Sequence, residues 1–225
     1  DTLFASAALG AAGAGIYSRA YNITTQMKEP FAVLDQTMRQ AFVAQRSLDD
    51  AAASRATLAG LRLVVLVASM VAAGVIVLRE ALVALLLGPQ WEAVMLPLAI
   101  LAASLPARVA RLYLDGFTYA RGSIRHMLVR NIAIIAMLAC GLWLWATEGV
   151  EAIALVVAAV HVATLFFRGG SVDTAIAGTR MKRLAAMVPG YAAGALTVVL
   201  GELPGLYWTG ASNLSEWGTR AAICI

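Results

Sequence analysis

The chain alternates long apolar runs with short polar stretches, a pattern typical of helices that cross a membrane. Four runs carry almost no charge and occupy residues 63–78, 131–147, 152–167 and 184–201. A helix needs about 20 mostly apolar residues to cross the hydrocarbon core of a bilayer. Extended to helical length, these runs predict spans at 58–78, 131–147, 150–167 and 184–201.

Two further segments, 14–44 and 92–120, are long enough to span but carry charges and prolines. Residues 1–9 and 218–225 resemble the end and the start of additional helices. The sequence therefore predicts an all-α polytopic membrane protein of about six transmembrane helices plus truncated ends. Pro30, Pro97 and Pro106 are hinge candidates, because a proline inside a helix removes a backbone hydrogen bond.

Composition supports this class. The chain is 61% hydrophobic and 13% charged, whereas soluble domains are about 45–50% apolar and about 25% charged. The net charge of +4 follows from loop topology and predicts no nucleic-acid partner. Cys140 and Cys224 lie in apolar runs, which argues against a disulfide framework or a thiolate metal site. We expect no metal and no cofactor.

Basic residues are distributed unevenly between alternate loops. Loops 45–62, 121–130 and 168–183 hold ten Arg and Lys residues, whereas the opposite loops 10–16, 79–91, 148–151 and 202–217 hold one, Arg79. Cytoplasmic loops of membrane proteins carry the excess of Lys and Arg. The pattern predicts that loops 45–62, 121–130 and 168–183 are cytoplasmic.

Charges within the membrane are concentrated in the two long segments. The cations are Arg19, Lys28, Arg39, Arg108 and Arg111, and the carboxylates are Glu29, Asp35 and Asp115. At 100° per residue, Lys28, Asp35 and Arg39 share a helix face, and so do Arg108, Arg111 and Asp115. Because charge in the bilayer is costly, such residues face a bundle interior or a wet cavity. The positive surplus predicts a substrate cavity that favours an anion.

A structural interpretation of the same residues stays open. Arg39 with Asp35, and Arg111 with Asp115, could be neutralising pairs, and Arg19 could extend to the interface. Gly190 and Gly194 form a GxxxG pattern that predicts close helix packing. His161 lies alone in an apolar run, which favours a packing role over a proton relay. No nucleophile–base pair or phosphate-cradling loop is present, and the sequence predicts no enzyme.

Two stretches resemble a known family. Gly15, Tyr17, Ala20 and Tyr21 form a G-x-Y-x-x-A-Y pattern with Pro30 downstream, and residues 86–91 read LLGPQW. Together they resemble Wzx-type polysaccharide (O-antigen or exopolysaccharide) flippases of the multidrug/oligosaccharidyl-lipid/polysaccharide exporter superfamily. The resemblance covers roughly residues 1–170, while residues 171–225 agree in hydropathy only.

This resemblance implies a fold and a function. Such flippases have two pseudo-symmetric lobes around a cavity with alternating access, and residues 1–225 would form a fragment of the C-terminal lobe. They move undecaprenyl-pyrophosphate-linked oligosaccharide across the bacterial inner membrane for polysaccharide or lipopolysaccharide biosynthesis. The implied partners are this lipid-linked oligosaccharide, membrane lipids, the missing N-terminal lobe and a polysaccharide polymerase. No catalytic residue is implied.

Three alternatives remain at this point. A lipid II flippase would use the same cationic cavity for the same pyrophosphate group. A drug or cation antiporter of the same fold would prefer an anionic cavity, which the positive surplus argues against. A membrane scaffold without transport would need no charged stripes inside its helices.

Overall fold

A computed structural model describes residues 2–44, 50–120, 124–165 and 180–207, and these residues form helices and short turns with no strand among them. Near several helix ends only the backbone is described, including residues 34–44 and 117–120. The elements are α1 (Thr2–Ala44), α2 (Asp50–Val77), α3 (Arg79–Leu86), the 3₁₀ helix η2 (Pro89–Val94), α4 (Met95–Ala103), α5 (Leu105–Ala120), α6 (Ile124–Trp145), the 3₁₀ helix η3 (Ala146–Glu148), α7 (Val150–Ala163) and α9 (Arg180–Tyr207).

Four helical segments of the described chain are long and apolar enough to cross a membrane. They are Ser54–Val77, Pro89–Gly116, Leu128–Glu148 and Met181–Glu202, and Val150–Ala163 is a shorter apolar helix. The 43-residue helix α1 is long enough to cross but is not among the four. The protein is an all-α polytopic membrane protein, as the hydropathy pattern predicted.

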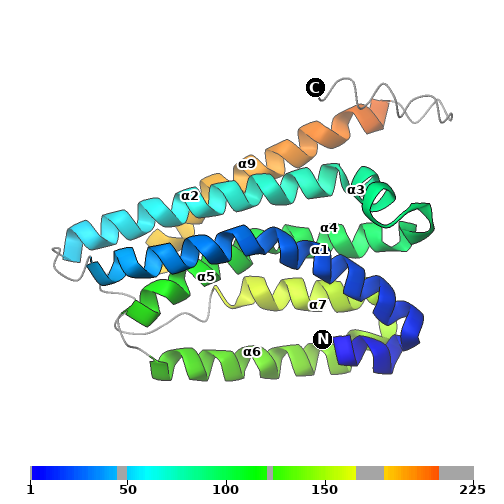
Figure 1. Ribbon diagram of the computed structural model, residues 1–225, viewed down its shortest axis with the longest axis horizontal. Coiled ribbons are helices and arrows are strands. Elements are labelled where there is room, and N and C mark those ends of the chain that lie inside the picture. Colours follow the sequence, from blue (N-terminus) through cyan, green and yellow to red (C-terminus); the bar gives the residue numbers. More distant parts are fainter. Residues whose placement is uncertain (1, 45–49, 121–123, 166–179, 208–225) are drawn as a thin grey trace.

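The long helices run side by side in one bundle (Figure 1). The end of α1, the start of α2, the end of α5 and the starts of α6 and α9 all lie toward one end of it (Figure 1). These are the helix ends that flank the three basic loops. The connections at 45–49, 121–123 and 166–179 lie outside the described residues, and their cytoplasmic location stays a prediction.

Helix α5 lies at the centre of the bundle. It packs against α1, α2, α4, α6 and α7. In the span that contains α4 and α5, 67% of the most apolar window is buried, against 17% in the span formed by α6. Side chains of α5 such as Leu105 and Val109 pack with Phe31 of α1 and Ala68 of α2. A charge carried by α5 is therefore enclosed by neighbouring helices.

The segment predicted as one span at 92–120 is interrupted at Ser104. There the backbone leaves α4, and the Ser104 hydroxyl donates a hydrogen bond to the Leu101 carbonyl at 2.7 Å. Pro106 is the second residue of α5, and Pro97 lies in the first turn of α4. The first turn of a helix tolerates proline, because its N–H groups have no intrahelical acceptor.

Helix α1 departs from helical geometry at Gly10, where φ is 70°, and not at Pro30. Positive φ is accessible to glycine because it has no Cβ. Pro30 lies inside α1, which continues through that residue with helical dihedral angles. Whether Pro30, Pro97 or Pro106 acts as a hinge during transport remains a prediction.

Helices α2 and α9 approach each other closely along a row of glycines. A Cβ on Gly190 would lie 2.9 Å from the backbone nitrogen of Leu66, and one on Gly194 would lie 3.0 Å from the Ser69 carbonyl oxygen. A methyl group cannot be accommodated against backbone atoms at these distances. The packing role predicted for the GxxxG pattern is confirmed.

This contact gives a stability prediction. Gly190→Ala is expected to lower the free energy of unfolding by about 1–3 kcal/mol, the usual cost of overpacking a tight interface. The matched control is Gly74→Ala in α2, where a Cβ meets nothing within 4 Å. Both changes alter helix propensity equally, so the difference between them reports packing. Unfolding in mixed detergent micelles, followed by circular dichroism, measures it; equal stability would contradict the packing argument.

A buried cationic cluster as candidate site

One face of α1 presents aromatic and polar side chains to the bundle. Tyr17, Tyr21, Thr25 and Lys28 fall within about 80° of arc at helical spacing. The rings of Tyr17 and Tyr21 stack with centroids 5.8 Å apart, and Tyr17 is fully buried. Since α1 packs against α5, this face meets the charged face of α5.

Arg108 of α5 is the most enclosed cation of the predicted set, with 5% of its surface exposed. Its guanidinium lies over the Tyr21 ring, 5.5 Å from the centroid. Its Nη2 donates a hydrogen bond of 3.4 Å to the Thr25 hydroxyl. Its Nη1 is buried and has no hydrogen-bond partner among the described residues. The guanidinium therefore keeps donor capacity that the described side chains do not use.

Three other groups share the electrostatic environment of Arg108. Lys28 lies within electrostatic range of both Arg108 and Arg111. Arg111 lies within electrostatic range of Arg108 and Tyr21. His161 of α7 lies within electrostatic range of Arg108, Arg111 and Lys28. We call Lys28, Arg108, Arg111 and His161 the cationic cluster. Helices α1, α5 and α7 contribute to it.

Asp115 lies beside the arginines of the cluster. Asp115 accepts a hydrogen bond from Nη1 of Arg130 at 2.5 Å, which joins α5 to α6 through an ion pair. Asp115 also acts on Arg111, one turn earlier on α5. A single carboxylate thus lies between two guanidinium groups.

The charges around the cluster do not balance among the side chains that the structure describes. Lys28, Arg108, Arg111 and Arg130 are cationic, and two carboxylates face them, Asp115 and, beside Lys28, the exposed Glu29. His161 apart, this leaves a surplus of two positive charges. Buried charges are normally paired, so the surplus favours an anionic ligand over a purely structural network.

The structure separates the predicted site residues into three groups. It brings together Lys28, Arg108, Arg111 and, through the ion pair, Asp115. It places Arg19 apart, exposed, with its guanidinium 5.5 Å from the centroid of the Trp91 ring. The side chains of Asp35 and Arg39 lie outside the described residues, although the backbone of α1 continues through both. Their contribution stays a prediction.

Three members of this region were not singled out from the sequence. His161 was interpreted as a packing residue, Arg130 as part of a loop, and Tyr21 only as part of a family pattern. Tyr21 could have been found from its spacing, because it precedes Lys28 by seven residues on one face. His161 and Arg130 join the site through the packing of α6 and α7, which no local pattern reports.

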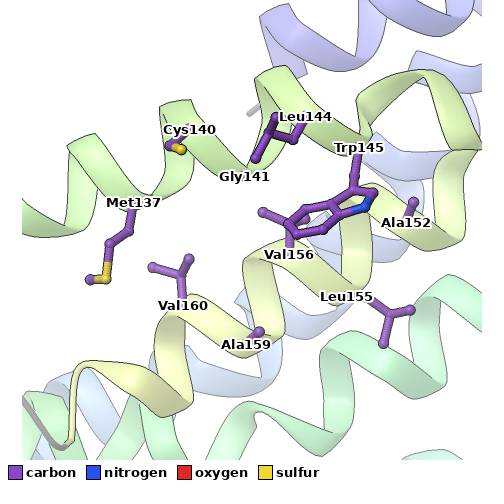
Figure 2. A pocket seen from close by; sticks show the side chains of 10 residues that line it. All are labelled: Met137, Cys140, Gly141, Leu144, Trp145, Ala152, Leu155, Val156, Ala159 and Val160. Carbon is purple, nitrogen blue, oxygen red and sulfur yellow. The ribbon is translucent and has the colours of Figure 1, made fainter.

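A second feature is an apolar groove of about 530 Å³ between α6 and α7. Figure 2 shows the Trp145 indole lying across it, with Met137 and Val160 toward its other end. Its lining offers no charged side chain, so it does not suit an anion. No group of three or more metal-ligating side chains occurs in the described part of the chain.

Comparison with known proteins supports the resemblance stated above. No curated protein and no solved structure matches the chain. Residues 1–96 match the family model described as polysaccharide biosynthesis protein. The match covers α1, α2 and the LLGPQW segment, and residues 97–170 lie beyond it. It confirms, for this part of the chain, the resemblance to the Wzx-type polysaccharide exporters.

Proposed function

We propose that the protein is part of a flippase that moves undecaprenyl-pyrophosphate-linked oligosaccharide across the bacterial inner membrane. The observation that carries the proposal is the convergence of Lys28, Arg108 and Arg111 inside a membrane bundle, where Arg108 Nη1 has no partner among the described residues. The match of residues 1–96 to polysaccharide biosynthesis proteins supports a role in polysaccharide synthesis.

The chemistry of the cluster fits a pyrophosphate group. Guanidinium and ammonium groups form short, charge-assisted hydrogen bonds to phosphate oxygens. A cation inside the bilayer costs at least about 2.5–3.5 kcal/mol on insertion scales. An anionic ligand would offset this cost during transport, which gives a reason for placing charge where lipid disfavours it.

Depletion of the full-length protein from its native cells tests the proposal. We expect lipid-linked oligosaccharide to accumulate in the cytoplasmic leaflet and surface polysaccharide to fall, while the lipid-linked peptidoglycan precursor stays at its normal level. Complementation with Arg39→Ala and with Arg111→Ala, each checked for presence in the membrane, asks whether these two cations are needed.

Other outcomes of the depletion separate the alternatives. Accumulation of the peptidoglycan precursor instead would favour a lipid II flippase. Normal levels of both lipids would refute a flippase role for this protein. Normal export in both complemented variants would mean that Arg39 and Arg111 act structurally.

A further inference from the structure

A small cavity lies between α2, α9 and the break that separates α4 from α5. Its volume is about 160 Å³. Ser69 of α2 and Tyr191 of α9 line it, together with Ala103 and Pro106 at the break. Pro106 lies about 200° around α5 from Arg108, so the cavity faces a different side of α5 from the cationic cluster.

The hydroxyl of Ser69 is enclosed and unused. Ser69 is 3% exposed, and its Oγ has no hydrogen-bond partner among the described residues. A hydroxyl inside a helix commonly donates back to a carbonyl three or four residues earlier. Thr24 donates in this way to the Ala20 carbonyl at 3.2 Å, and Thr197 to the Ala193 carbonyl at 2.9 Å. Ser69 makes no such bond, so its hydroxyl remains available to a partner in the cavity.

A second unused hydroxyl meets the same cavity. Oη of Tyr191 is buried and has no hydrogen-bond partner in the described part of the chain. Helices α2 and α9 lie side by side (Figure 1). Gly194, on the same face of α9 as Tyr191, lies against Ser69, since a Cβ on Gly194 would come within 3.0 Å of the Ser69 Cβ. The close approach of the two helices therefore brings both hydroxyls to one cavity.

We propose that this cavity is a hydration site, in which water bridges the hydroxyls of Ser69 and Tyr191. A water molecule occupies about 30 Å³ in the liquid, so the cavity has room for it. Purely apolar cavities stay dry, but each hydroxyl here can both donate and accept a hydrogen bond. A lipid chain in the same space would leave both hydroxyls unpaired, which is unfavourable. The inference does not rest on the proposed function.

The helix break gives a further reason for water at this position. Pro106 has no N–H, so it cannot donate to a carbonyl of the preceding turn. In membrane helices, ordered waters and serine side chains satisfy backbone groups that a proline leaves free. Because Ala103 and Pro106 line the cavity, water held there would lie beside the backbone of the break.

Radiolytic hydroxyl-radical labelling of the purified full-length protein, followed by mass spectrometry, tests this inference. Radicals formed from a bound water modify the side chains that touch it, so Tyr191 is expected to be labelled severalfold faster than Tyr113. Tyr113 is the matched control, because it is 5% exposed and its hydroxyl donates a hydrogen bond of 3.2 Å to the Thr57 carbonyl. In Ser69→Ala, labelling of Tyr191 should fall toward that of Tyr113, because the bridging water loses one of its partners. Equal labelling of the two tyrosines in the wild type, or labelling of Tyr191 that is unchanged in Ser69→Ala, would overturn the inference.

A double-mutant cycle provides a second measurement. Ser69→Ala and Tyr191→Phe each remove one hydroxyl, and each should lower the denaturant midpoint of unfolding. Because both remove the same bridge, the double variant should lose less than the sum of the two single losses. The matched cycle combines Ser69→Ala with Tyr113→Phe, whose contact at Thr57 lies about 18 Å from Ser69 along α2, and its losses should add. Additive losses in the first cycle, or a gain in stability from either single change, would mean that the two hydroxyls share no water and would overturn the inference.

Discussion

Replacing Arg108 with glutamine is expected to abolish export of the lipid-linked oligosaccharide while the protein remains in the membrane. Arg108 is the most enclosed member of the cluster, and its Nη1 is not used by the described residues. Glutamine keeps an amide donor but removes the positive charge. Hydrogen bonds to charged groups contribute about 1.5–3 kcal/mol, and each 1.4 kcal/mol is about tenfold in affinity. We therefore expect anion affinity to fall about 10- to 100-fold.

The measurement combines transport with binding. Cells that carry Arg108→Gln should accumulate the lipid-linked oligosaccharide in the cytoplasmic leaflet, and the purified variant should bind sulfate weakly. Arg108→Lys should retain part of the affinity, because it keeps the charge but loses the two-pronged donor geometry of the guanidinium.

The matched control is Arg55→Gln, the same chemical change at an exposed position of α2. It should export normally. Normal export by Arg108→Gln would show that the cluster does not handle the substrate. A variant missing from the membrane would show that Arg108 supports the fold, and would contradict the ligand role argued here.

The positions of the helices along the chain, and the charged face of α5, could largely be predicted from the sequence. Apolar runs located α2, α6, α7 and α9, because a membrane helix must satisfy its own backbone and present apolar side chains to lipid. Helical spacing also grouped Arg108, Arg111 and Asp115 on one face of α5. Each of these conclusions depends on neighbours within a single helix.

The partners across helices could not be predicted in this way. Spacing grouped Asp115 with Arg111 on one face of α5, and the structure adds Arg130 of α6, which contacts the same carboxylate from another helix. His161 comes within electrostatic range of Arg108 because α7 packs against α5. Arg19 was grouped with the other cations because it lies in the same long segment, 14–44. It lies about 200° around α1 from Tyr17, and its guanidinium lies over the Trp91 ring. Tertiary packing decides such pairings.

The ion pair between Asp115 of α5 and Arg130 of α6 gives the prediction with the largest expected effect on stability. Asp115→Asn is expected to lower the free energy of unfolding by about 3–5 kcal/mol, the cost of removing one partner of a buried ion pair. The side chains of Arg130 and Asp115 are only 8% and 15% exposed. The change also removes the carboxylate that acts on Arg111, so two guanidinium groups lose their counter-charge.

A second ion pair in the same chain provides the comparison. Arg79 and Glu202 join α3 to α9, but their side chains are 28% and 43% exposed. Glu202→Gln is expected to cost about 0–1 kcal/mol, because exposed pairs contribute little. Detergent-induced unfolding of both variants, followed by circular dichroism, gives the difference.

The reversed pair Asp115→Arg with Arg130→Asp separates a direct bond from a general effect of charge. It restores one cation and one anion at the contact between α5 and α6, and should recover part of the lost stability relative to Asp115→Arg alone. Equal losses for Asp115→Asn and Glu202→Gln would mean that water reaches the Asp115–Arg130 pair within the bundle. The positive surplus beside Arg108 would then be solvated, and the need for an anionic ligand to offset it would disappear.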